Sequence, residues 1–199
     1  MKQTLRRGRG AIAPTIISVL VFGLVAYGEE IDAELRVKVD AKLPEIRRWA
    51  GDPTIVKEVR SQNEAPSETA RNLNQENCKS LSVLDPLVRE FSKNEVGRFL
   101  KSVKGDDVAE AFVSAANGTK VGFLTKTTNW SHAGKPKHEV PMTGSVWYGS
   151  VEVDESTGLQ QVQVSVPVLE DGKPIGSLVV GLDISRLNEQ PAPKTKTPP

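Results

Sequence analysis

The side chains best suited to ligand chemistry lie between residues 126 and 148. This stretch contains both histidines, two of the three tryptophans and three lysines. Aromatic walls combined with several cationic donors are typical of a pocket for a small anion such as a carboxylate. We therefore expect an anion site formed by Trp130, His132, Lys135, Lys137, Trp147 and Tyr148. The alternative is that the lysines are solvated and the aromatic rings pack against a sheet.

Two further candidates come from predicted strands nearer the C-terminus. Ser165 and Asp183 lie on the less apolar side of their strands. If that side faces a ligand, Ser165 would donate a hydrogen bond to a bound anion, and Asp183 would accept one from an amine. The alternative for both residues is solvation at a sheet edge or a structural hydrogen bond.

Metal binding and catalysis have little support in the sequence. His132 and His138 are six residues apart, which does not match the i, i+4 spacing of a helical metal-binding pair. The single cysteine, Cys78, excludes an internal disulfide and a cysteine-rich metal site. There is no Gly-x-Ser-x-Gly elbow and no phosphate-binding glycine loop. We expect no metal, no cofactor and no enzymatic activity, and we regard a hydrolase as a remote third class.

The charge balance argues against nucleic acid as a partner. The chain has 26 basic and 25 acidic residues, a formal net charge of +1, whereas nucleic-acid-binding proteins carry a clear basic excess. Four of the cations lie within the first nine residues, so the rest of the chain is net acidic.

An apolar leader follows those four cations. Residues 11–28 contain no charged side chain, and as a helix they would span ~27 Å, close to the thickness of a bilayer core. Residues 1–28 therefore form a signal anchor, which we favour, or a cleaved signal peptide. The four cations are expected to stay on the cytoplasmic side of the membrane. The protein is therefore expected to be a single-pass protein of the inner membrane, with its domain in the periplasm or outside the cell.

Helical patterns dominate the first half of the exported part. Residues 29–66 are predicted to form membrane-proximal helices, because apolar residues recur at helical spacing from Ile31 to Trp49. Asp52 and Pro53 resemble the start of a second helix. The apolar face of residues 31–50 either covers the core or forms the seam of a homodimer. A further stripe from Cys78 to Phe91 predicts a helix that continues to Val103 and that Pro86 bends or splits in two.

Strand patterns dominate the second half, which makes this an α+β chain. Five antiparallel strands are expected, with hairpin turns at 117–118 and 171–172 and a long polar loop over 127–143. Residues 160–169 alternate between apolar and polar, whereas residues 175–184 are apolar on both faces and are therefore predicted to be central. Residues 67–187 form the main domain, and residues 188–199 form a disordered proline-rich tail.

Several fragments in this order resemble the Cache family of extracytoplasmic, PAS-like sensor domains over residues 49–187. They are WAGDPTIV at 49–56 with Asn63, AFVSAANG at 111–118, DESTG at 154–158, VSVPV at 164–168, IG at 175–176 and GLD at 181–183. The resemblance implies a long helix leaving the membrane, followed by a five-stranded antiparallel PAS-like sheet. It also implies that a carboxylate or an amino acid binds between the sheet and the loop joining strands two and three.

The expected function is therefore that of a membrane-anchored extracytoplasmic sensor domain. The ligand would close the loop onto the sheet and bias helix packing near the membrane, and a separate membrane signalling protein would read that change. A homodimer through residues 31–50 is compatible with this. The alternative is an envelope interaction or scaffold protein with a PAS-like fold and no ligand.

Overall fold

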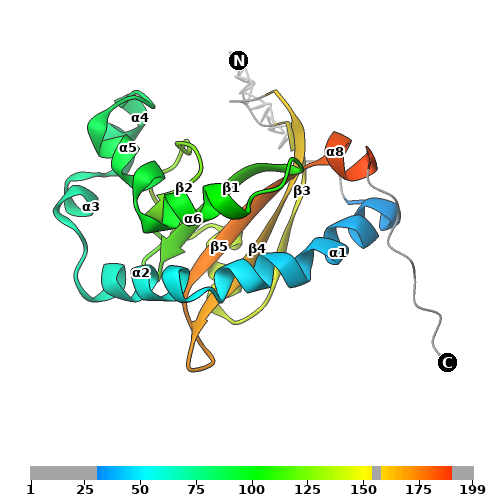
Figure 1. Cartoon of the computed structure of the whole chain (residues 1–199), viewed down its shortest axis with the longest axis horizontal. Coiled ribbons are helices and arrows are strands. Elements are labelled where there is room, and N and C mark those ends of the chain that lie inside the picture. Colours follow the sequence, from blue (N-terminus) through cyan, green and yellow to red (C-terminus); the bar gives the residue numbers. More distant parts are fainter. Residues whose placement is uncertain (1–30, 154–157, 190–199) are drawn as a thin grey trace, which may run out of the picture.

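The computed structural model describes residues 31–153 and 158–189, which form a helical layer followed by a sheet. The helices and strands succeed one another in the predicted order (Figure 1). The helical part consists of α1 (Ala33–Ala50), α2 (Pro53–Glu64), α3 (Glu68–Asn72), α4 (Gln75–Ser80), α5 (Pro86–Lys93) and α6 (Glu95–Val103). The sheet part consists of β1 (Val108–Ala115), β2 (Lys120–Phe123), α7 (Pro136–Met142), β3 (Trp147–Val153), β4 (Gln160–Glu170), β5 (Lys173–Asp183) and α8 (Ile184–Glu189).

The five strands form one antiparallel sheet in the order β2-β1-β5-β4-β3. β5 lies in the middle, between β1 and β4, which confirms the prediction from its apolar faces. Its hairpin with β4 turns at Asp171 and Gly172, which both have positive φ angles, 49° and 76°. That pair of angles is typical of the tight turns whose twist matches the two strands.

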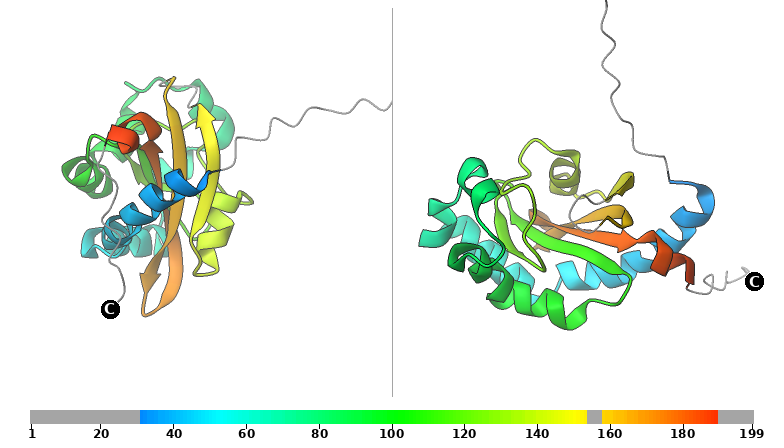
Figure 2. Two further views of the ribbon diagram at one scale, coloured as in Figure 1. Left: turned by 90° about the vertical axis from the view of Figure 1, so that its right-hand side faces the viewer. Right: turned by 90° about the horizontal axis from the view of Figure 1, so that it is seen from above.

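One face of the sheet, here called the helix face, is covered by α1, α2 and α6 (Figure 2). The four valines of β4 at 162, 164, 166 and 168 point to this face, as their alternation predicts. They pack against Val39, Ile46 and Trp49 of α1 within the main apolar core. The Asp52 side chain accepts the backbone N–H of Thr54, so the predicted cap of α2 is confirmed.

The opposite face, here called the loop face, is covered by the segment between β2 and β3 and by α4 and α5 (Figure 2). A second apolar cluster fills the β2 end of this face, where Phe91 stacks on Phe123 and meets Trp130 edge-on at 4.9 Å. Cys78 is buried in this cluster, as expected of a small apolar side chain.

Two predicted elements differ from the structure. The helix predicted through Cys78 and Phe91, bent or split in two at Pro86, is divided further: a new helix does begin at Pro86, but there are four short helices and Leu84 is exposed. Asn74, Asp85 and Asn94 each cap a new helix there, which lets the chain restart instead of continuing one stripe. The stretch expected as a polar loop over 127–143 contains α7, whose buried side is made by His138 and Pro141.

Among the residues that the structure describes, no helix is long and apolar enough to cross a membrane. The predicted membrane segment at 1–28 lies outside these residues, as do residues 190–199 of the predicted tail, whereas residues 188–189 belong to α8.

Candidate functional site

A group of buried and half-buried polar side chains lies on the loop face of the sheet. It is here called the polar cluster and consists of Glu110 and Ser114 of β1, Lys120 of β2, His132 and Lys137 of the β2–β3 connection, and Gln163 of β4. Buried polar groups are costly unless they are partnered, so each contact in this cluster is informative.

Lys120 is the most unusual member, because its side chain is 0% exposed. Its Nζ lies 2.5 Å from His132 Nδ1 and 3.3 Å from the centre of the Phe112 ring. Neither of these two contacts supplies a negative charge. Burial therefore holds the pKa of Lys120 well below its ordinary value, although the charge of Glu110 opposes that shift.

A β-bulge directs Lys120 to this face. Phe123 pairs with Phe112 and Gly122 with Val113, but Lys120 pairs with Ser114 because the register shifts by one residue at Val121. Without that shift, strict alternation would place Lys120 on the helix face, among apolar side chains. The bulge therefore moves a cation from the apolar core into the polar cluster.

His132 is held against Lys120 by two contacts. Its ring stacks on Phe112 with the centroids 4.8 Å apart, and its backbone N–H donates to Gly118 O. Burial lowers the pKa of His132 to about 2, and the neighbouring charges of Lys120 and Lys137 act in the same direction. The imidazole is therefore neutral and available as an acceptor for Lys120.

Lys137 and Glu110 form the other half of the cluster. Lys137 Nζ contacts Gln163 Oε1, and Gln163 Nε2 donates to Glu110 Oε2 at 2.8 Å, so the glutamine links a cation to a carboxylate. Partial burial lowers the pKa of Lys137, while Glu110 and Glu152 oppose that shift. The two lysines of the cluster are therefore influenced by two carboxylates, Glu110 and Glu152, while the two close contacts of Lys120 Nζ are uncharged.

Ser114 adds an unused hydrogen-bonding group. It lies directly opposite Lys120 on β1 and is 0% exposed. No hydrogen-bond partner for its Oγ is found among the described residues. A buried hydroxyl without a partner costs ~1–3 kcal/mol, and an acceptor placed between Ser114 and Lys120 would remove that cost.

A serine–histidine pair also lies on the loop face, but its geometry is structural. Ser177 Oγ is 2.8 Å from His138 Nδ1, and His138 Nε2 is 3.1 Å from the carbonyl oxygen of Ala116. A carbonyl only accepts, so Nε2 carries the proton in the neutral ring and Nδ1 accepts from Ser177. Both side chains are almost fully buried, and both ring nitrogens of His138 are occupied by contacts within the protein.

The structure brings four of the eight predicted site residues toward this cluster. His132 and Lys137 belong to it, and Lys137 Nζ lies 5.9 Å from the centre of the Trp147 ring. Ser165 lies opposite Trp147 on the loop face, although its Oγ donates to Leu178 O within the sheet.

The other four predicted site residues lie elsewhere. Trp130 is buried against Phe91 in the second apolar cluster, and Lys135 is exposed just before α7. Tyr148 is on the helix face, where its hydroxyl donates to Asp40 of α1. Asp183 caps α8 by accepting the backbone N–H groups of Ser185 and Arg186.

Sequence reasoning missed Glu110, Ser114, Lys120 and Gln163. The lysine beside the apolar residues 121–123 could have indicated a site, because lysine is seldom fully buried unless it is paired. The bulge that turns Lys120 to the loop face has no such signature. Among the described residues, no three His, Cys, Asp or Glu side chains are grouped to hold a metal ion.

Comparisons with known proteins give structural matches only. No family model and no curated protein matches this sequence. The sensor domain of the Vibrio cholerae histidine kinase DctB is 14% identical with a TM-score of 0.49, over 77% of this chain and 52% of that one. The Escherichia coli DcuS sensor domain is 13% identical with a TM-score of 0.44, over 77% and 96% of the two chains. The sensory domain of the Campylobacter jejuni chemoreceptor Tlp3 is 15% identical with a TM-score of 0.40, over 78% and 66%.

The helical layer, the five-stranded antiparallel sheet and the covering segment between β2 and β3 match the architecture that the resemblance in the sequence predicts. The chain spans about half the length of the DctB domain that it matches.

Proposed function

We propose that this protein is a membrane-anchored extracytoplasmic sensor domain that binds a small carboxylate at the polar cluster. The observation that supports this is Lys120, a fully buried cation whose two close contacts are uncharged. Burying an ammonium group costs several kcal/mol, and a bound carboxylate would add a negative charge beside Lys120 to the more distant one of Glu110. Lys120 and Ser114 would donate to the carboxylate, and Lys137 would balance the charge of Glu110. The ligand would be an organic acid or an amino acid.

Entry of the ligand requires the covering segment to move. Gly134 and Gly144 flank α7, and both have positive φ angles, 73° and 88°. Glycine adopts that conformation without strain, so these two positions suit a segment that opens and closes. Closure over the ligand would re-form the contacts of Lys137 and His138 with the sheet.

The first test is a ligand screen on the full chain. We expect at least one organic acid or amino acid to raise the melting temperature. Tryptophan fluorescence is the signal that reports unfolding. At a concentration 100 times Kd, binding adds ~2.7 kcal/mol, or ~5–10 °C for a domain of this size. Calorimetry on the active compound should then give one site per chain. If monocarboxylates, dicarboxylates and amino acids all leave the melting temperature unchanged, the proposal is wrong.

The signal would reach α1 through β3. Trp147 and Tyr148 are adjacent but lie on opposite faces, so the first is near Lys137 and the second binds α1. The Tyr148 hydroxyl donates to Asp40, and Arg36 lies 3.6 Å above the ring. A shift of β3 on ligand binding would therefore change how α1 is held, close to the predicted membrane segment. A separate membrane signalling protein would read the change.

This path predicts a separation of binding from response. Tyr148→Phe removes the bond to Asp40 but leaves the polar cluster intact, so ligand affinity should stay within about twofold. Amide hydrogen exchange in α1 should change when ligand is added to the parent protein and much less in the variant. An equal change in both proteins would exclude this route.

The alternative function is an envelope scaffold without a ligand. The observation that favours it is that Trp130 is packed against Phe91 and that the contacts of Lys120 come from the protein itself. A scaffold would show no ligand-dependent change in melting temperature, and Lys120→Met would leave every partner interaction unchanged.

A further inference from the structure

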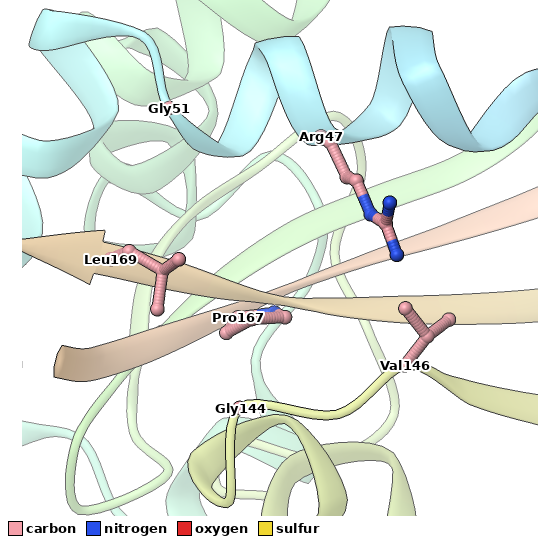
Figure 3. A pocket seen from close by; sticks show the side chains of 6 residues that line it. All are labelled: Arg47, Gly51, Gly144, Val146, Pro167 and Leu169. Carbon is pink, nitrogen blue, oxygen red and sulfur yellow. The ribbon is translucent and has the colours of Figure 1, made fainter. Parts of the chain in front are cut away.

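A cavity of about 350 Å³ lies at the outer edge of β4 (Figure 3). Its lining shares no residue with the polar cluster and comes from α1, the connection between α7 and β3, and the end of β4. The lining residues are Arg47, Gly51, Gly144, Val146, Pro167 and Leu169.

The sheet leaves this space because its strands differ in length. β3 starts at Trp147, opposite Ser165, whereas β4 continues to Glu170, so the end of β4 extends past the start of its outer neighbour. Pro167 lies in this extension and has no N–H to offer another strand. Gly144 turns the incoming chain at a φ of 88°, and a Cβ there would meet no atom within 4 Å.

The floor of the cavity is apolar and partly exposed. A register shift between Val168 and Leu169 ends the strict alternation of β4, and Leu169 remains 44% exposed. Val146 and Pro167 continue the apolar surface, and neither glycine contributes a side chain. Exposed apolar surface in a concave site is a common feature of binding sites.

One cation faces this apolar floor. Figure 3 shows the Arg47 side chain extending from α1 across the cavity toward Val146. The neighbouring Arg48 pairs with Glu45, and Arg60 of α2 pairs with Glu170. No ion pair within the described part of the chain includes Arg47, so its planar guanidinium is open to a bidentate partner.

We propose that this cavity binds a small organic acid with an apolar body, separately from the polar cluster. The carboxylate would pair with the guanidinium of Arg47, and the apolar body would lie on Val146, Pro167 and Leu169. The volume lies at the lower end of the ~300–1,000 Å³ typical of small-molecule sites, which suits a single ring or a short aliphatic chain. The inference is independent of the proposed function.

The test uses 4-fluorobenzoate as the probe and fluorine NMR as the readout. The full chain carrying Lys120→Met is titrated in detergent, so that the polar cluster does not contribute to binding. A sample that contains detergent without protein corrects for partitioning of the probe into micelles. We expect saturable binding that Arg47→Gln weakens at least fivefold. Leu169→Ser should weaken it as well, because that change removes apolar contact. The uncharged 4-fluorobenzamide should bind more weakly than the acid.

Arg48→Gln is the matched control, because it removes a cation from the same turn of α1 that pairs with Glu45 and does not line the cavity. Its affinity for the probe should equal that of the parent. If Arg47→Gln and Arg48→Gln weaken probe binding equally, the effect comes from the overall positive charge of the helix, and the proposal is overturned. Absence of saturable binding would overturn it too, and neither result would bear on ligand binding at the polar cluster.

Discussion

Lys120→Met should abolish carboxylate binding at the polar cluster and make the protein more stable. Methionine has a similar length and no charge, so the buried ammonium disappears while the volume is kept. The cost of burying the ammonium group disappears with it, so we expect the free energy of unfolding to increase. Losing the charge-assisted bond to the ligand should weaken binding at least 100-fold, which corresponds to ~2.7 kcal/mol. Calorimetry with the active compound and urea unfolding measure the two effects.

Lys135→Met is the matched control for this experiment. Lys135 lies in the covering segment between β2 and β3 and is exposed, so its replacement should leave both stability and affinity almost unchanged. The proposal fails if Lys120→Met destabilises the protein while ligand affinity is retained. That combination would mean that the lysine holds the fold together and has no role in binding.

The stability of the protein should decrease steeply in mildly acidic solution because of His132. Its pKa is lowered to about 2 in the folded protein, whereas an unfolded chain titrates near 6.5. The unfolded state therefore binds more protons between these values, and stability is full above pH 6.5 and lost as the pH falls. The loss approaches ~1.4 kcal/mol per pH unit, or about 2.7 kcal/mol between pH 7 and pH 4.5. Urea unfolding at a series of pH values measures the slope.

The control is His132→Asn, which places a carbonyl oxygen where Nδ1 contacts Lys120 and has no titrating group. The stability of this variant should depend less on pH below 6.5, by about the amount that His132 contributes. His138 is present in both proteins, so the difference between the two slopes belongs to His132. Parallel slopes would show that His132 is protonated in the folded state.

Much of the fold follows from local patterns that the sequence displays openly. The alternation of valine with polar residues in β4 predicts one buried face, and that face packs against α1 as expected. The apolar run of β5 predicts a central strand, because only a strand covered on both faces gains by being apolar throughout. The turns at 117–118 and 171–172 use positive φ angles at Gly118, Asp171 and Gly172. These residue types adopt such angles readily, so the residues themselves indicate both hairpins.

The helices between residues 67 and 105 were less predictable, because several weak signals compete there. Apolar spacing favours one long helix, but Asn74, Asp85 and Asn94 each offer a side-chain cap that starts a new one. The balance is decided by packing on β2, to which α5 and α6 both contribute. Propensity alone does not contain that contribution.

The sequence by itself determined the α+β class, the succession of helices and five strands, and the central position of β5. It did so because each of these depends on periodicity or on turn chemistry over a few neighbouring residues. Only the tertiary structure decided which side chains meet, because a one-residue register shift turns Lys120 to the loop face. This outcome depends on strand pairing across the whole domain, where a displacement of one residue reverses the face and is not encoded in the spacing of nearby residues.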